Sequence, residues 1–140
     1  MKHIVKDNYL LENNISMSIE KMPNTETRYR IKIDNNTLYS ITKSGEKLSW
    51  QNSHYHKDCN ELYLVQEGKI LIVIQDKEKI SKKILIKGQM IDIKPNISHN
   101  VYMFEDTETC VLKYGDVKPN DWHSDKNLDN ICKEIDVENT

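Results

Sequence analysis

The 140-residue sequence contains no alanine, only four glycines and three prolines, and a single phenylalanine. Because alanine is the best helix former, its absence disfavours a helical protein. The longest uninterrupted apolar run, residues 70–74, has five residues, whereas a transmembrane helix needs roughly 20. The N-terminal stretch MKHIVKDNYLLENN contains no apolar block of the kind found in secretory signals. We therefore expect no membrane partner and no secretory signal.

Cysteine and charge excess are also scarce. The three cysteines (Cys59, Cys110 and Cys132) form no CxxC pair and are odd in number, which disfavours a disulfide framework or a zinc ribbon. Free thiols are typical of a reducing compartment, so we expect a cytoplasmic protein. Lys and Arg total 20 against 22 Asp and Glu, a net charge of −2. Nucleic-acid binders normally carry a basic excess, and we expect no nucleic-acid partner.

What the sequence does contain is isoleucine, a β-branched residue that fits strands, at seventeen positions. Apolar and polar residues alternate in short segments, as in Tyr29, Ile31 and Ile33, and turn residues such as Asp34-Asn35-Asn36 separate them. This pattern predicts a helical turn over 7–11 and strands over residues 15–19, 29–33, 38–41, 61–65, 69–75, 80–86, 90–93, 100–104 and 109–114. Strands of this length and spacing indicate an all-β sandwich or barrel.

The length predicts one domain spanning residues 1–140. Its β core covers about residues 28–115, an N-terminal strand segment covers 1–27, and a tail covers 116–140. In the tail, Ser124 is expected to cap a short C-terminal helix that carries Leu128, Ile131 and Cys132 on one side.

Four side chains stand at spacings that suit a metal site. His54 and His56 are two residues apart, so on a strand both imidazoles point to the same face. The polar residues 57–60 are expected to turn the chain and return the carboxylate of Glu61, and His99 opens another predicted strand. Three imidazoles and one carboxylate suit one divalent transition metal ion such as Zn, Fe, Ni, Mn or Cu. A tetrahedral zinc would instead make the site closed and structural.

The segment HYHKDCNELYLVQEG, residues 54–68, resembles the first motif of the cupin superfamily. That motif reads His, one residue, His, three or four residues, Glu, six residues, Gly, and His54, His56, Glu61 and Gly68 satisfy it. The second motif places a His eleven residues after a Gly, as Gly88 and His99 do. Two positions depart from it: the proline is displaced to Pro95, and Asn96 replaces a glycine. Asn tolerates a left-handed backbone, so we expect the turn to be kept.

The resemblance implies a jelly-roll cupin barrel, also called a double-stranded β-helix, in which His54, His56, Glu61 and His99 hold a metal. It also implies a homodimer that pairs through N-terminal strands such as residues 15–19. Tyr63 shares strand parity with Glu61 and is expected to face inward. Tyr63, Trp50 and Lys113 are candidate substrate-binding residues, although core packing for the aromatics and solvation for the lysine are alternatives.

Three classes of function follow from this reading. In the first, a metal-dependent enzyme acts on a small polar molecule such as a sugar or keto acid. There the metal is a Lewis acid and Glu61, when displaced from the metal, is a catalytic base, as in isomerases and epimerases; an iron-dependent dioxygenase is the alternative enzyme. The second class is a non-catalytic module that binds a small-molecule ligand. The third is a storage or structural cupin.

Overall fold

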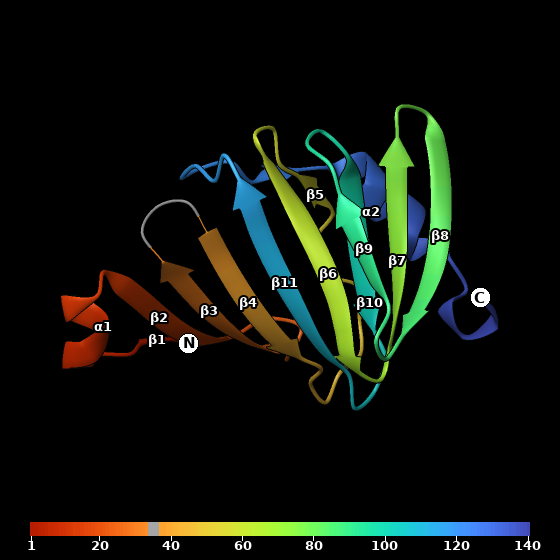
Figure 1. Cartoon of the computed structure of the whole chain (residues 1–140). Coiled ribbons are helices and arrows are strands. Elements are labelled where there is room, and N and C mark those ends of the chain that lie inside the picture. The colour runs from red at the N-terminus through yellow and green to blue at the C-terminus, as the bar shows by residue number, and fades with distance from the viewer. Residues whose placement is uncertain (34–36) are drawn as a thin grey trace.

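The protein is built from two antiparallel sheets that face each other as in a jelly roll (Figure 1). The computed structural model describes residues 1–33 and 37–140. The expected turn at Asp34-Asn35-Asn36 lies outside the described residues, but the strands on its two sides pair antiparallel, as predicted for a hairpin.

The larger sheet has the strand order β1-β2-β3-β4-β11-β6-β9. Its members are β1 (Lys2–Ile4), β2 (Ile15–Lys21), β3 (Thr27–Ile33), β4 (Thr37–Lys43), β6 (Cys59–Glu67), β9 (Met90–Ile93) and β11 (Glu108–Gly115). The smaller sheet has the order β12-β5-β10-β7-β8. Its members are β5 (His54–Tyr55), β7 (Lys69–Asp76), β8 (Lys79–Ile86), β10 (Ser98–Met103) and β12 (His123–Ser124). The all-β prediction is confirmed.

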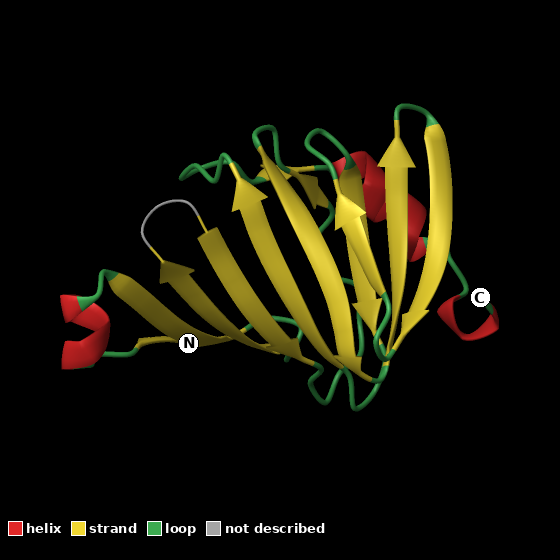
Figure 2. Cartoon of the chain, viewed as in Figure 1, coloured by secondary structure: helices red, strands yellow, loops and turns green. Residues whose placement is uncertain are grey.

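In the described residues, helical structure is confined to short segments near the two ends of the chain (Figure 2). Helix α1 (Asn8–Glu12) precedes β2, and the 3-10 helix η1 (Val137–Asn139) follows α2 (Lys126–Lys133). The expected C-terminal helix is confirmed, but its cap is Asp125 and not Ser124. The Asp125 carboxylate accepts the Leu128 backbone N–H at 3.0 Å, whereas Ser124 is already paired with His54 as part of β12. None of the helices in the described part of the chain is long and apolar enough to cross a membrane.

The apolar core lies between the sheets, and a second apolar cluster lies outside the smaller one. The inner cluster contains Val65 of β6 and Ile70 and Ile72 of β7, none of which is exposed. Val73, on the opposite face of β7, packs against Leu128 and Cys132 of α2. Strand β7 is therefore covered on both faces, which explains why residues 70–74 are uniformly apolar instead of alternating.

Two turns that adjoin the motif residues each contain a residue with positive φ. Gly68 joins β6 to β7 at φ +80°, and a Cβ there would lie 2.3 Å from Thr107 Oγ1. Asn96 adopts φ +66° between β9 and β10. The prediction that asparagine keeps the left-handed turn is thus confirmed, and this turn delivers His99 to β10.

Candidate metal centre

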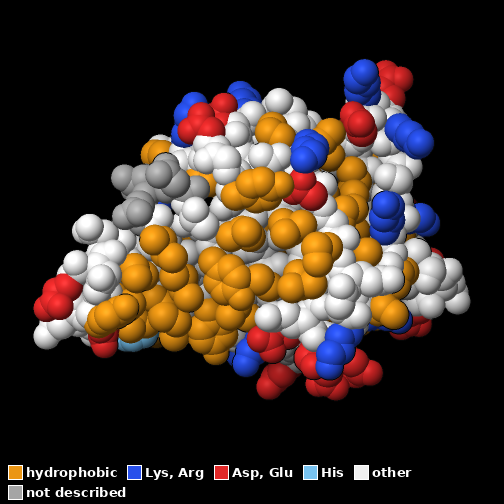
Figure 3. All heavy atoms as spheres, viewed as in Figure 1, with side chains coloured by type: hydrophobic (Ala, Val, Ile, Leu, Met, Phe, Trp, Pro, Cys, Tyr) orange, Lys and Arg blue, Asp and Glu red, His pale blue; other side chains and the backbone are white. Residues whose placement is uncertain are grey.

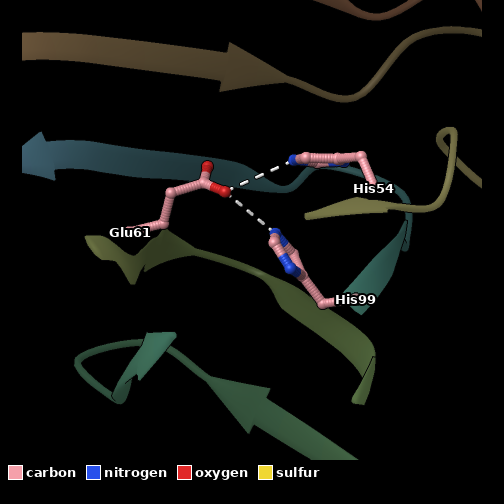
Figure 4. A group of neighbouring side chains, drawn as sticks. All are labelled: His54, Glu61 and His99. Atoms are coloured by element: carbon pink, nitrogen blue, oxygen red, sulfur yellow. Dashed lines mark hydrogen bonds and ion pairs between the residues drawn. The ribbon is translucent and has the colours of Figure 1, made fainter. Parts of the chain in front are cut away.

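The four predicted ligands come from three strands of the two facing sheets. His54 belongs to β5 and lies directly opposite His99 of β10 in the strand register. His56 follows β5, and Glu61 lies on the inner face of β6 in the other sheet. The chain bends at Lys57 and Asp58 only, because Cys59 and Asn60, expected in the turn, already belong to β6. Figure 4 shows the His54 and His99 rings pointing at the Glu61 carboxylate.

All three imidazoles converge on one oxygen of Glu61. Its Oε1 atom lies 3.3 Å from Nε2 of His54, 2.7 Å from Nε2 of His56 and 3.0 Å from Nε2 of His99. Ligand atoms of His54, Glu61 and His99 all lie within 4.8 Å of one another, and His56 joins them only through its contact with Glu61. Glu61, His56 and His99 are each at most 5% exposed. The cluster is therefore a buried group of ligand atoms and not a set of surface side chains.

The backbone sets the tautomer of each ring. Each Nδ1 atom lies against a backbone carbonyl oxygen: that of Asn52 for His54 and that of Ile97 for His99, both at 3.0 Å, and that of Asp121 for His56. A carbonyl oxygen only accepts, so each Nδ1 carries the proton and donates. In a neutral imidazole the Nε2 atom is then left with an unshared electron pair, which is the arrangement found in metal-bound histidines.

In this arrangement hydrogen-bond acceptors face one another, because the Nε2 atoms of the neutral rings and the Glu61 carboxylate have no hydrogen atom to donate. Nε2 of His56 is completely buried and makes no hydrogen bond, although Oε1 of Glu61 lies beside it. A buried polar atom without a partner is costly. A divalent cation bound by the three Nε2 atoms and the carboxylate would remove that cost. The residues present therefore fit a metal ion.

Burial and local charges hold the groups in the forms that a metal requires. Burial opposes ionisation of Glu61, but hydrogen bonds that the surrounding imidazoles donate when their Nε2 atoms carry hydrogen outweigh it and hold the pKa of this carboxyl well below its ordinary value. The pKa of His54 is lowered, chiefly because burial disfavours the charged ring. Burial and the nearby charge of Glu61 raise the pKa of Tyr63 well above its ordinary value. At neutral pH the site thus presents a carboxylate, a neutral His54 and a protonated phenol.

Tyr63, expected to face inward, does so: it is 4% exposed and touches two of the ligands. Its hydroxyl group lies 3.4 Å from Oε2 of Glu61 and 3.1 Å from Nε2 of His99. The phenol can donate its proton to only one of them at a time. Tyr63 is therefore a hydrogen-bond donor at the edge of the ligand cluster.

Two residues at the site had no sequence signal: Asp121 and Trp122. The Asp121 carboxylate accepts the backbone N–H groups of Lys57 and Asp58 at 2.8 and 3.0 Å, while its carbonyl oxygen accepts from His56. Asp121 therefore holds the bend that carries His56. Trp122 stacks on the His54 ring, with centroids 5.5 Å apart.

A second group of ligand atoms, contributed by His56, Cys59 and Asp121, lies close by. Its members are already engaged or poorly suited to a cation. The Asp121 carboxylate accepts two backbone N–H groups, and burial raises the pKa of the Cys59 thiol to about 11, which keeps it protonated. Of the two groups among the described residues, the one centred on Glu61 is therefore better suited to a metal ion.

Two adjoining hollows open beside the ligands. The inner one, about 110 Å³, is lined by Glu61, Tyr63 and Lys113 among others, and the outer one, about 460 Å³, by Trp50 and Lys113 among others. The three candidate substrate-binding residues therefore all reach this space, although Trp50 also packs edge-on against Tyr102 at 5.6 Å. A larger hollow of about 590 Å³ shares no lining residue with these two.

Comparisons with known proteins agree with this architecture. No protein-family model and no curated protein matches the chain. KdgF from Halomonas sp. superposes with a TM-score of 0.58 at 14% identity over 69% of this chain and 84% of its own. A cupin superfamily protein from Desulfitobacterium hafniense gives 0.57 at 14% over 70% and 84%. A Bacillus subtilis oxalate decarboxylase variant gives 0.65 at 14% over 89% of this chain but 32% of its own.

The chain has the cupin fold. Identities this low establish the fold alone. The reaction, the ligand and the assembly must be argued from the residues of this chain.

Proposed function

We propose that this protein is a metal-binding cupin that acts on a small polar molecule such as a sugar or keto acid, in the manner of an isomerase or epimerase. The observation that supports this most directly is the orientation of the rings: each Nδ1 atom faces a backbone carbonyl oxygen, which directs the three Nε2 atoms at the Glu61 carboxylate. His54, His56, Glu61 and His99 would hold one divalent ion, with Zn, Fe, Ni and Mn all suited to this donor set.

When bound, such an ion supplies Lewis acidity, which polarises a carbonyl or enediolate oxygen. The chain supplies the proton chemistry and the binding surface. The Glu61 carboxylate lines the inner hollow and, when displaced from the ion, is a base there, and the Tyr63 hydroxyl is a donor beside it. An isomerase needs a base and a donor on one substrate, and these two groups are 3.4 Å apart. Trp50 and Lys113 line the outer space in which the rest of the substrate would lie.

The metal site is tested by replacing two ligands together. The double variant His54→Ala, His56→Ala should contain no stoichiometric metal after purification without added metal, as measured by elemental analysis. His3→Ala is the matched control, because His3 is exposed on β1 and outside the cluster. Full metal content in the double variant would refute the site.

Turnover separates the remaining functions. An iron-dependent dioxygenase consumes oxygen together with substrate, whereas an isomerase does not, and a non-catalytic binding cupin binds its ligand without turnover. Glu61 supports the isomerase, because its carboxylate lies 3.4 Å from the Tyr63 hydroxyl group and the two can serve as base and proton donor. Oxygen uptake by the iron-loaded protein would favour the dioxygenase instead.

We also propose a homodimer, supported by the outer face of the larger sheet. In β3, Arg28 and Arg30 line the hollows, so the alternation of side chains turns Tyr29 and Ile31 to the outside. The register aligns Ile31 with Met17 and Tyr39, and Tyr39 with Leu112. Figure 3 shows hydrophobic side chains gathered over β2, β3, β4 and β11. Large exposed apolar patches mark interaction sites.

The dimer is tested by sedimentation. Ile31→Glu should halve the mass in solution, whereas Ile86→Glu, which places the same charge at an exposed isoleucine of β8, should not. A wild-type monomer at micromolar concentration would refute the assembly. We further propose a cytoplasmic location, which the three unpaired, buried thiols support.

A further inference from the structure

Basic side chains are concentrated around the hollows beside the Glu61 cluster. The inner and outer hollows share six lining residues, of which three are basic: Arg28, Arg30, Gln51, His54, Lys113 and Trp122. The shared residues mark where the two hollows meet beside the cluster. That region carries positive charge on two strands of the same sheet, β3 and β11.

The inward direction of these side chains is unusual for an alternating strand. In β3 the apolar residues face outward and the arginines face the hollow, although an isolated amphipathic strand normally turns its apolar face to the core. Across the sheet, Lys113 is the direct register partner of Glu61 and therefore shares its inner face. Ser40 and Thr42 of β4, which lies between β3 and β11, add short polar side chains to the same wall.

Carboxylates in the described structure offset only part of this charge. Arg30 pairs with Glu20 at 2.8 Å, and Arg28 lies 3.6 Å from Glu26. Lys113 has no carboxylate within ion-pair distance among the described residues. These two ion pairs leave one positive charge over, which the carboxylate of Glu61 in the inner hollow opposes, and a divalent ion held by Glu61 would bring the net charge to +2. The wall is matched to an anion of one or two charges.

The two arginines also repel each other. The pKa of Arg28 is lowered, first by burial and then by the charge of Arg30. Arg28 directs Nε at Thr42 Oγ1, 3.3 Å away, and its remaining N–H groups have only the distant Glu26 as an ionic partner. An anion between two guanidinium groups lowers this repulsion and is held by charge-assisted hydrogen bonds.

We infer that this wall binds the carboxylate group of a small organic anion, with Arg28, Arg30 and Lys113 as the recognising side chains. The planar guanidinium fork matches the two oxygens of a carboxylate. Trp50 and Trp122, the two tryptophans of the chain, line the outer hollow and would contact the uncharged part of the molecule. That this anion is the substrate rests on the proposed function; its binding does not require the metal.

The test compares acids with neutral counterparts of similar size. Binding of malonate and malonamide, and of D-glucuronate and D-glucose, is measured by calorimetry at low ionic strength, with tryptophan fluorescence to report the site. At least one acid should bind about tenfold more tightly than its neutral counterpart. Equal affinities within both pairs, or no binding of either acid, would overturn the inference. Inorganic phosphate is the third probe, and arginine-dependent binding of phosphate without either acid would overturn the carboxylate assignment.

Variants locate the binding. Arg30→Gln should weaken the acid by about tenfold, and Arg28→Lys, which keeps the charge but loses the fork, by a few-fold. Lys82→Gln removes an exposed charge on β8 and should change nothing. Unchanged affinity in both arginine variants would refute the assignment, and thermal unfolding confirms that each variant is folded.

Metal content separates this inference from the proposed function. Arg28→Lys and Arg30→Gln should retain full metal, because neither side chain belongs to the ligand cluster. Acid binding that persists in a wild-type protein unable to bind any metal would leave the anion wall standing and refute only the proposed function. Full metal content with no acid binding would refute the anion wall and leave the proposed function standing.

Discussion

Replacing Glu61 by glutamine distinguishes a metal site from a buried ion-pair cluster. If the three rings are neutral, as their Nδ1 contacts indicate, Nε2 of His54 and His56 face a carboxylate that cannot donate to them. The glutamine amide has nearly the same shape and supplies two N–H donors. Glu61→Gln should therefore stabilise the metal-free protein. If the rings are instead protonated, the same change breaks buried ion pairs.

The two cases differ in sign and size. One or two new hydrogen bonds at about 1 kcal/mol each would raise the free energy of unfolding by about 1–2 kcal/mol, or Tm by several degrees. Breaking a buried ion pair would instead cost about 3–5 kcal/mol. Wild-type protein should gain about 2.7 kcal/mol from metal at a hundred times its Kd. The variant, which lacks the anionic ligand, should gain much less.

The measurement is thermal unfolding followed by circular dichroism at pH 7.5, first with a chelator and then with Zn²⁺, Ni²⁺ or Mn²⁺. Glu67→Gln is the matched control, because Glu67 lies on the same strand but is exposed and pairs only with Lys87. The reasoning about the rings would be refuted if Glu61→Gln lowered the free energy of unfolding in chelator by several kcal/mol and metal did not change the stability of the wild type.

Four further outcomes are expected. Asp121→Ala leaves two backbone N–H groups of the His56 bend unpaired, so metal affinity measured by chelator competition should fall about 10–100-fold; unchanged affinity would show that the bend is held by other contacts. Gly68→Ala should destabilise the fold in denaturant titration by several kcal/mol more than Gly88→Ala, since both positions have positive φ but only the Cβ at Gly68 meets a neighbour, Thr107. Asn96→Gly should be nearly neutral in the same titration, and Asn96→Val should cost about 1–2 kcal/mol because φ is +66°; equal stabilities would argue against the left-handed turn. Because the pKa of His54 is lowered in the folded state, the stability of metal-free protein should be full above the ordinary His pKa of about 6.5 and fall as the pH drops below it, and His54→Ala should flatten that part of the profile.

The strands were predictable because their sequence signals are local. These signals each span a few residues: the alternation in β3, the turn residues before β7 and β9, and the change from polar to apolar residues along β10. The predicted segments overlap the observed strands. The left-handed position at Asn96 followed from the resemblance to the second cupin motif, in which Asn96 replaces a glycine, and from the tolerance of asparagine for that backbone. The helix cap was misplaced by one residue because Ser124 and Asp125 are both good capping residues, and pairing of Ser124 with β5 decides between them.

The surroundings of the ligands were not predictable in the same way. Asp121 acts on His56 through its backbone carbonyl oxygen, and every residue carries one, so no side-chain pattern marks it. Arg28 and Arg30 face inward, whereas the polar face of an amphipathic strand usually faces solvent. It depends on the outer face of β3 having apolar neighbours from β2 and β4, and that is a property of the sheet, not of one segment.

The two-residue strand β5 has a consequence for how the protein is made. It is held between β10 and β12, and β12 lies nearly seventy residues further along the chain. On the ribosome, the four ligand side chains are synthesised before Asp121 and the β12 residues that follow it. His56 therefore gains its orienting acceptor only after the C-terminal segment has emerged and docked. The proposed loading with metal would therefore follow the docking of the segment that contains Asp121.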